Sequence, residues 1–521
     1  MKCMRKMIVA AAVLIISVSM IFVLPVDAAK KTSGKKYKIS GRTITPVVKK
    51  KKDISKNVNE ALREANKRAT SKKIYTVKIP KGTYYISQSL KIRSNTKLKA
   101  NGCTIKAKKG GFNMIATGTS QENKKAKGYN AYKNITIEGG KWINTKSNKS
   151  AGIRICRGSN IVIRNVEMSG GSEKHMIEMA AVNKVKVTGC YFHDSYVRNS
   201  KDKCEAIQID VCTNSKAFKN IIFDGTPCRN ITIDKNKFKN LSRGVGTHSQ
   251  LLNSYIDNVK ITDNTFTNIS QESIACVNYV NARISGNTIS NSGGGILFHY
   301  SKTSNHSVYT RIGNGKKAFS SKKITNANSV IENNTIQTAY HPICDKNVGI
   351  ELHGKEYKKN EKSADGGTIP AGDYYLSGVT VQNNNITTAG YGIVFSDAKQ
   401  NKILGNTIKG AGYASSDPDV KNKKYDGIYL NEASTENIIE NNRISNSIRH
   451  GIFLNRGSSA ATINSNTIAK CSEYGIRLFE NSKVTQSMRG NNISGCGISA
   501  IGVSRQSDCS VAGGIDDNVI K

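Results

Sequence analysis

Apolar residues recur at a regular interval along most of the chain. Between Ala151 and Arg505 the sequence holds twelve copies of a short strand-like segment, usually apolar–any–apolar, such as Gly427–Leu430 and Gly451–Leu454. A polar phrase of the type Ile463–Ile468 lies between successive copies, and where no loop intervenes it returns after 22 to 26 residues. A repeat of this length is typical of stacked coils, none of which can bury its apolar side without its neighbours. The repeat therefore predicts a solenoid of short strands.

An asparagine occupies the same position of the polar phrase in nine coils, two residues before the apolar residue of the next strand. These residues are Asn236, Asn264, Asn287, Asn334, Asn384, Asn406, Asn442, Asn466 and Asn491. Stacked coils would place them about 4.8 Å apart, where their amides can hydrogen-bond along the stack and to the turn backbone. We therefore expect a structural asparagine ladder.

One segment near the N-terminus has a helical period. Its apolar residues predict a helix over residues 57–70, which is followed by a strand containing Ile-Pro-Lys-Gly-Thr-Tyr at residues 79–84. This pairing resembles the N-terminal cap of the pectin-lyase-like superfamily of right-handed parallel β-helices. A cap is needed physically, because the first coil would otherwise expose an open sheet edge and an apolar interior.

The resemblance implies an all-β fold, namely a single-stranded right-handed parallel β-helix of about twelve or more coils with an N-terminal capping helix. The expected organisation is a signal peptide at residues 1–28, a basic linker at 29–56 and the β-helix domain at 57–521. The signal is expected because three basic residues precede an apolar stretch from Met7 to Leu24 and a small-residue cleavage site. An uncleaved N-terminal anchor is the alternative, and no other segment could span a bilayer. The mature chain is therefore expected to be secreted, and not bound to a membrane after cleavage.

The charge of the chain is strongly basic, with 79 Lys and Arg against 37 Asp and Glu and a formal net charge of +42. A solvated basic surface would explain this balance, and so would affinity for a polyanion. An exported chain without a nucleic-acid recognition module is not expected to bind nucleic acid. An acidic polysaccharide substrate, or association with an anionic cell wall, fits better.

The cysteine and metal-ligand patterns predict neither a disulfide framework nor a structural metal site. Eleven cysteines follow the signal, an odd number that argues against a fully paired framework, although one bridge among Cys204, Cys212 and Cys228 is compatible with their spacing. No cofactor is required by the sequence, because it contains neither Cys-x-x-Cys nor His-x-x-x-His. Calcium at Asp417 and Asp419 is an open alternative with weak support.

Aligning the twelve strand copies predicts which residues face inward. The aligned apolar anchors are Ile153, Ile177, Ile207, Val245, Ile274, Ile296, Ile350, Ile393, Ile428, Ile452, Ile476 and Ile501. Neighbouring positions should project outward, and in the resembling family this strand carries the binding groove. In the C-terminal coils the third position after the anchor holds Ser396, Asn431, Asn455, Phe479 and Ser504, whereas the central coils hold charged residues.

The central coils therefore contain the candidate site. We expect the catalytic residues to be Asp210, His248, Glu205 and Arg243, and the substrate-binding residues to be Glu178, Gln208, His175, Glu272 and His299. Long insertions at residues 193–203, 211–229, 300–327 and 354–377 depart from the repeat mostly beside these coils. Loops on a rigid scaffold commonly form the walls of a cleft.

Two chemistries suit these residue types. Hydrolysis of a glycoside needs two carboxyl groups, one protonated and one ionised, and the acids of the cluster supply candidates. Elimination needs a base and a cation that neutralises a uronate, for which His248 and Arg243 are suitable. An ordinary cross-strand pair between Asp210 and His248, or a surface ion pair between Glu205 and Arg243, is the alternative without function.

The family resemblance implies a carbohydrate-active enzyme, since members are mostly polysaccharide lyases, glycoside hydrolases and epimerases. The chain lacks the Asp-Asp and Gly-His-Gly set of polygalacturonases, the Arg-x-Pro-x-x-Arg motif of pectate lyases and the Asp-Pro-His-Glu motif of alginate epimerases. The expected function is thus a secreted enzyme that cleaves a polysaccharide by an undecided reaction. A non-catalytic surface or wall protein that binds glycans is the alternative.

Overall fold

The structure is a computed structural model. It describes residues 36–145, 150–171, 174–195, 205–212, 221–222, 224–247, 254–300, 326–344, 347–362, 368–369, 371–412, 415–419, 422 and 424–521. The predicted signal peptide and several parts of the predicted insertions lie outside these ranges. Residues 36–521 belong to one compact unit.

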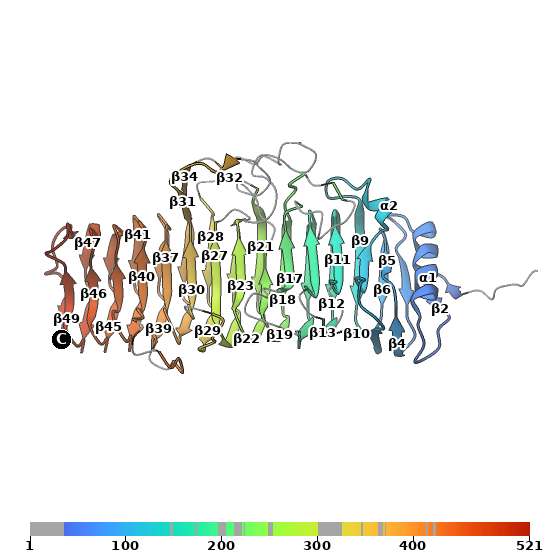
Figure 1. Cartoon of the computed structure of the whole chain (residues 1–521), viewed down its shortest axis with the longest axis horizontal. Helices are drawn as coiled ribbons and strands as arrows, with labels where there is room; N and C mark the ends of the chain where they lie inside the picture. The colour runs from blue at the N-terminus through green and yellow to red at the C-terminus, as the bar shows by residue number, and fades with distance from the viewer. Residues whose placement is uncertain are drawn as a thin grey trace, which may run out of the picture. The chain divides into compact units, whose positions relative to one another are not determined.

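Three long sheets are built from strands that each coil contributes in turn (Figure 1). Sheet I contains β1 (Tyr37–Ser40), β2 (Thr43–Pro46), β3 (Tyr75–Lys78), β6 (Thr96–Lys99), β9 (Tyr132–Glu138), β12 (Gly158–Arg164), β15 (Asn183–Thr188), β18 (Arg229–Asp234), β21 (Ile256–Thr262), β24 (Tyr279–Val280), β25 (Arg283–Ser285), β28 (Ser329–Glu332), β35 (Val379–Gln382), β38 (Lys402–Leu404), β41 (Asn437–Glu440), β44 (Ser459–Asn464), β47 (Lys483–Arg489) and β50 (Ser510–Val511).

Sheet II follows sheet I within each coil. It contains β4 (Gly82–Ile86), β7 (Cys103–Ala107), β10 (Lys141–Asn144), β13 (Glu167–Gly170), β16 (Tyr191–His193), β19 (Lys237–Leu241), β22 (Thr265–Ile269), β26 (Thr288–Ser292), β29 (Thr335–Thr338), β36 (Asn385–Thr387), β39 (Thr407–Lys409), β42 (Arg443–Ser445), β45 (Thr467–Ala469), β48 (Asn492–Ser494) and β51 (Val519–Ile520).

Sheet III completes each coil and carries the repeated apolar segment. It contains β5 (Leu90–Ile92), β8 (Ile115–Thr117), β11 (Ile153–Cys156), β14 (Ile177–Ala180), β17 (Glu205–Asp210), β20 (Arg243–Gly246), β23 (Glu272–Val277), β27 (Gly294–His299), β30 (Ile350–His353), β37 (Ile393–Ser396), β40 (Ile428–Asn431), β43 (Ile452–Leu454), β46 (Tyr474–Leu478) and β49 (Ser499–Val503).

The strand pairing in sheet III confirms the sequence alignment. Each predicted anchor pairs in parallel with the anchor of the next coil, from Ile153 opposite Ile177 through to Ile476 opposite Ile501. All the anchors except Ile501 are buried in the apolar interior. The parallel all-β helix with one strand per sheet per coil is therefore confirmed, and β5 and β8 extend sheet III beyond the twelve predicted copies.

The asparagine ladder is also present. In each step the side-chain oxygen of one asparagine accepts the backbone N–H of the asparagine one coil earlier, as between Asn236 and Asn264 at 2.9 Å. The amide nitrogen donates both along the ladder and to a strand carbonyl, so Asn264 reaches Asn287 at 3.0 Å and the carbonyl of Ile233 at 2.9 Å. All nine predicted residues are buried, and Asn518 continues the series.

The N-terminal helix lies at the end of the stacked coils, next to β2 and β5 (Figure 1). Helix α1 (Ser55–Arg68) begins two residues before the predicted start, because the Asp53 carboxylate accepts the Ser55 N–H at 2.9 Å. Val58, Leu62 and other apolar residues on its inner face are buried. The segment expected to be a linker contains β1 and β2, and Ile44 of β2 is fully buried. Ordered structure thus starts ahead of the helix.

Smaller elements interrupt the coils. Helix α2 (Ser120–Asn123) lies between β8 and β9 and has a capping box between Thr119 and Glu122. The insertion at residues 354–377 contains two antiparallel pairs, β31 (Lys355–Tyr357) with β34 (Gly372–Tyr374) and β32 (Glu361–Lys362) with β33 (Thr368–Ile369). Within the described ranges, none of the helices has the length and apolar character that a bilayer crossing requires.

Candidate functional site

Six charged or amide side chains of sheet III are almost inaccessible to solvent. Five lie on β14, β17 and β20, and His175 lies just before β14. The six residues are His175, Glu178, Glu205, Gln208, Asp210 and Arg243, with residue exposures between 1% and 8%. Burial of so many polar groups is costly unless each is paired. A cluster of this kind on one sheet therefore needs either strong internal pairing or a functional reason, and its contacts show extensive pairing.

Arg243 lies between two carboxylates. Its Nη1 donates to Oε1 of Glu205 at 2.9 Å, and its Nη2 donates to Oε2 of Glu272. Burial alone would lower the pKa of Arg243, but the carboxylates of Glu272 and Glu205 outweigh it and hold that pKa above its ordinary value. The Glu205 side chain is 0% exposed, so its contact with the guanidinium is shielded from solvent.

The absence of a side chain at Gly246 makes room for this ion pair. An ideal Cβ at Gly246 would lie 2.5 Å from Cγ of Glu205 and 3.0 Å from Cδ of Arg243. Since Gly246 directly follows the inward anchor Val245, the two charged side chains lie on the outward side of sheet III, as the alignment predicts. Gly246 is also in register with Gln208, so the Glu205 side chain extends along the face toward Gln208.

Replacing Gly246 by alanine is expected to displace Glu205 and to lower the free energy of unfolding by roughly 1–3 kcal/mol, because the added methyl group overlaps a packed side chain. The same replacement in a Glu205→Ala background should cost much less, because the space is then open. Chemical denaturation of the two single variants and the double variant measures this coupling. Equal costs in both backgrounds would contradict the placement of Glu205.

The second carboxylate of β17 is held by an amide. Nε2 of Gln208 donates to Oδ2 of Asp210 at 2.6 Å, and both residues are buried. Among the described residues, Oε1 of Gln208 has no hydrogen-bond partner, so a water molecule or a substrate hydroxyl would be needed to satisfy it. Gln208 thus lies between Glu205 and Asp210 along β17 and contacts Asp210 directly. His248 lies outside the described residues.

Of the other predicted residues, His175 contacts Glu205, Glu178 pairs with Arg154, and His299 lies on a later strand of sheet III. Nδ1 of His175 is 3.3 Å from Oε2 of Glu205 and 3.2 Å from its backbone oxygen. Glu178 accepts a hydrogen bond from Nε of Arg154 at 2.7 Å. His299 lies on β27, three strands beyond β17 in sheet III, and its ring centroid is 5.8 Å from that of His353.

Two neighbours of the cluster were not predicted. The buried side-chain oxygen of Gln271 is 3.4 Å from Nη2 of Arg243, where it accepts a hydrogen bond. The fully buried Arg157 follows β11, and its Nη2 donates to Asp224 at 2.7 Å and to the carbonyl of Ile222 at 2.5 Å. Arg157 thus fixes part of the insertion that follows β17. Neither position belongs to the aligned outward rows, so the repeat gave no signal for them.

An acidic pair lies next to β37 and the β31–β34 hairpin. Asp397 is 7% exposed, and burial, with a smaller effect of the Asp373 carboxylate, raises the pKa of Asp397 to about 7. Lys399 donates to Asp373 and lies 4.9 Å from the centroid of the Tyr375 ring. Asp373 and Tyr375 belong to the insertion at residues 354–377. This insertion therefore contacts the segment that follows β37 through Lys399.

The raised pKa predicts a pH dependence of stability. In the unfolded chain an aspartate ionises near pH ~4. Between pH ~4 and 7 Asp397 is therefore protonated in the folded protein but ionised in the unfolded chain. The stabilisation from this group is full below pH ~4 and disappears as the pH rises through 7, with an upper limit of about 4 kcal/mol. Asp397→Asn should therefore reduce the loss of melting temperature between pH 5 and pH 8. The exposed-site control Asp508→Asn should leave that loss unchanged, and an unchanged loss in Asp397→Asn would contradict the burial argument.

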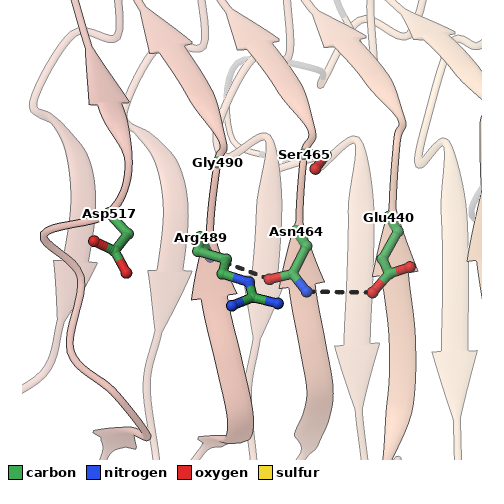
Figure 2. Close-up of a pocket in the computed structure, with 6 residues that line it drawn as sticks. All are labelled: Glu440, Asn464, Ser465, Arg489, Gly490 and Asp517. Atoms are coloured by element: carbon green, nitrogen blue, oxygen red, sulfur yellow. Dashed lines mark hydrogen bonds between the residues drawn. The ribbon is translucent and has the colours of Figure 1, made fainter.

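A shallow hollow on the solenoid is lined by residues of sheet I and of the turns next to it (Figure 2). Glu440, Asn464 and Arg489 are register neighbours on β41, β44 and β47 of sheet I. Asn464 donates to Glu440 at 3.3 Å and accepts the backbone N–H of Arg489 at 3.1 Å. These contacts join successive coils, so we interpret the hollow as part of the scaffold.

The described residues contain no group of three or more His, Cys, Asp or Glu side chains placed to hold a metal ion. At the weak calcium candidate, the carboxylate of Asp417 accepts the backbone N–H of Asp419 at 3.0 Å. Ten cysteines in the described ranges are free thiols, including Cys212 and Cys228, and Cys204 lies outside those ranges.

Two comparisons with known proteins point to a streptococcal surface protein as similar to this chain. The chain is 24% identical over 255 residues to "Plasmin and fibronectin-binding protein A" of Streptococcus pneumoniae, a match that covers 43% of this chain and 36% of that protein. The chain thus matches only about a third of the length of that relative. The crystal structure of PfbA, a surface adhesin of S. pneumoniae, shares 16% identity and covers 87% of this chain and 88% of its own, with a TM-score of 0.46.

A second solved structure comes from a virus. A tailspike protein of E. coli bacteriophage HK620, in complex with a pentasaccharide, shares 11% identity and covers 88% of this chain and 74% of its own, with a TM-score of 0.50. At such low identity the likeness concerns the fold alone. The family described as "Right handed beta helix region" matches residues 132–279 and 362–515, which is more than half of the chain. Together with the parallel sheets and the asparagine ladder, this match shows that the chain belongs to the right-handed β-helix family.

Proposed function

We propose that this protein cleaves a polysaccharide at the buried cluster of β14, β17, β20 and β23. The observation that carries the proposal is the position of Glu205, whose ionised carboxylate is held by Arg243 beside the Gln208–Asp210 pair. Burying charged groups lowers the free energy of unfolding. Active sites commonly contain such groups because charges in fixed positions, shielded from water, strongly stabilise the transition state of a reaction.

The two carboxylates of β17 can take different roles. Glu205 is stabilised in its ionised form by Arg243 and suits a general base or a nucleophile. Asp210 accepts a hydrogen bond from the Gln208 amide, and we assign it the role of proton donor. Gln208 lies between them and can orient a sugar hydroxyl through its unpaired oxygen. This division of roles supports hydrolysis of a glycosidic bond.

Elimination is less well supported by the same contacts. A lyase needs a cation that neutralises the substrate carboxylate, and the Arg243 guanidinium is already shared between Glu205 and Glu272. We therefore assign Arg243 to positioning Glu205. His248 remains a predicted base.

The rival function is glycan or host-protein binding without cleavage. It is favoured by the relative named as a plasmin- and fibronectin-binding protein and by the basic charge of this chain. The tailspike structure with a bound pentasaccharide supports a glycan ligand for a β-helix of this kind. Either function suits a location outside the cytoplasm, which the N-terminal apolar stretch and the surface adhesin among the similar proteins support.

An activity screen tests the proposal. Purified protein is incubated with neutral, carboxylated and sulfated polysaccharides, and chain length and reducing ends are measured over time. We expect shortening of at least one polysaccharide with new reducing ends and no unsaturated product. Formation of an unsaturated, ultraviolet-absorbing product would instead assign a lyase, and an unchanged chain length throughout the panel would favour the binding function.

A further inference from the structure

The C-terminal coils carry a second group of side chains on the outward side of sheet III. Tyr429 of β40 and Phe453 of β43 directly follow their inward anchors, and their rings stack with centroids 5.2 Å apart. Tyr391, which precedes β37, stacks on Tyr429 at 5.5 Å. The rings therefore form a ladder with one ring from each of three successive coils, in which Tyr391 and Tyr429 are partly exposed and Phe453 is buried.

An arginine is fixed against this ladder. The guanidinium of Arg449 lies 4.6 Å from the centroid of Phe453 and is bonded to the buried carboxylate of Asp426, with Nε to Oδ1 at 2.8 Å. Asp426 neutralises its charge. The neighbouring His450 adds no charge near neutral pH, because burial, and next to it the charge of Arg449, lowers its pKa to about 3.

Arg477 differs from Arg449 in that none of the described carboxylates is paired with it. Its guanidinium lies 4.7 Å from the centroid of Tyr474 and 5.5 Å from that of Phe479. In the part of the chain that the structure describes, no carboxylate is within ion-pair distance of it. Arg477 and both rings are partly exposed. A planar cation held over aromatic rings and open to solvent is well suited to bind an anionic group.

We propose that Arg477, Tyr474 and Phe479, together with the edge of the ring ladder, form a binding strip for an anionic polysaccharide. The acidic substituent pairs with the Arg477 guanidinium, and the sugar ring contacts the aromatic carbons. This proposal rests on the proposed function in one respect only, namely that the ligand is a polysaccharide. Binding at the strip does not require cleavage.

The strip is separate from the Glu205 cluster. Five strands of sheet III, namely β27, β30, β37, β40 and β43, lie between β23 and β46, the strand that carries Tyr474 and Arg477. This corresponds to more than about 20 Å at the usual strand spacing. The two places also differ in access, because the Glu205 side chain is 0% exposed whereas Arg477 is partly exposed. The strip could thus hold a long chain while a distant part of it occupies the cluster.

Binding of defined oligosaccharides to Arg477→Gln tests the strip. The probes are oligogalacturonate, its neutral methyl ester and a sulfated dextran oligosaccharide, measured by calorimetry at low salt. The matched control is Arg443→Gln, which removes the same charge from an exposed position of β42 on sheet II. All proteins also carry Glu205→Gln, so that no probe is cleaved.

We expect the parent protein to bind at least one charged probe at least ten-fold more tightly than the methyl ester. Arg477→Gln should raise that Kd at least ten-fold, whereas Arg443→Gln should change it less than two-fold. Preference for the galacturonate or the sulfated probe identifies the anionic group. The strip is rejected if neither charged probe binds, if the ester binds as tightly, or if both arginine variants weaken binding equally. None of these outcomes depends on whether the wild-type protein cleaves a polysaccharide.

Discussion

Glu205→Gln is expected to reduce the rate of polysaccharide cleavage by about 10²- to 10⁴-fold, the usual contribution of a residue that acts as a base or nucleophile. The glutamine has nearly the same shape and can still accept a hydrogen bond from Arg243, so the fold should be kept. The free energy of unfolding should fall by only about 1–3 kcal/mol, because Arg243 retains Glu272. Initial rates and a melting curve measure the two effects.

Glu138→Gln is the matched control for this variant. Glu138 of β9 is 7% exposed and is bonded to Lys97 at 2.7 Å and to Arg164 at 2.6 Å. It is thus another buried carboxylate held by cations, but it belongs to sheet I. We expect its variant to lose stability without losing activity. Equal activity in the two variants would show that Glu205 stabilises the fold only.

Asn384→Ala is expected to have the largest effect on stability. The Asn384 side chain accepts the Asn334 N–H at 3.0 Å and donates to the carbonyl of Ile331 at 2.9 Å and to Asn406 at 2.9 Å. Alanine removes these bonds and leaves buried donors and acceptors of both neighbouring coils unpaired. Each such group costs about 1–3 kcal/mol, so we expect a loss of about 3 kcal/mol or more.

The adjacent Asn385→Ala provides the control for the ladder. Asn385 is the first residue of β36 and is exposed, and its replacement should change the unfolding free energy by less than about 0.5 kcal/mol. Denaturant midpoints of both variants make the comparison, with fluorescence and circular dichroism recorded together because solenoids can unfold in parts. Similar midpoints for the two variants would contradict a structural role of the ladder.

The period of the sequence predicts most of this fold because each coil obeys the same packing rule. An apolar anchor such as Ile207 must enter the interior, and the asparagine two residues before the next strand's apolar residue must satisfy the turn, so the register follows from the pattern alone. The strand at Leu90–Ile92 was missed because it lies in the irregular first coils. The strands β1 and β2 precede the repeat and gave no periodic signal.

The site was predicted less completely for a physical reason. Alternation along a strand indicates that Gln208 and Asp210 face outward. It does not predict the rotamer of a long side chain, and therefore not which groups that side chain contacts. The sequence offers an ion pair between Glu205 and Arg243, but as a surface pair. Its burial depends on the space at Gly246, which a sequence pattern does not contain. The strip around Arg477 was missed because, of its residues, only Phe479 occupies the third position after an anchor. Tyr391 and Tyr474 occupy the second position before an anchor, and Tyr429, Phe453 and Arg477 the position directly after it.

The most direct test of the Glu205 cluster as the site of cleavage is a crystal structure of the Glu205→Gln protein with an oligosaccharide of the polysaccharide that the wild-type protein shortens. The proposed site predicts a sugar unit within hydrogen-bond distance of Gln208 and Asp210, with a glycosidic oxygen next to the residue at position 205. An oligosaccharide bound only to the strip around Arg477, or only to sheets I and II, would contradict it.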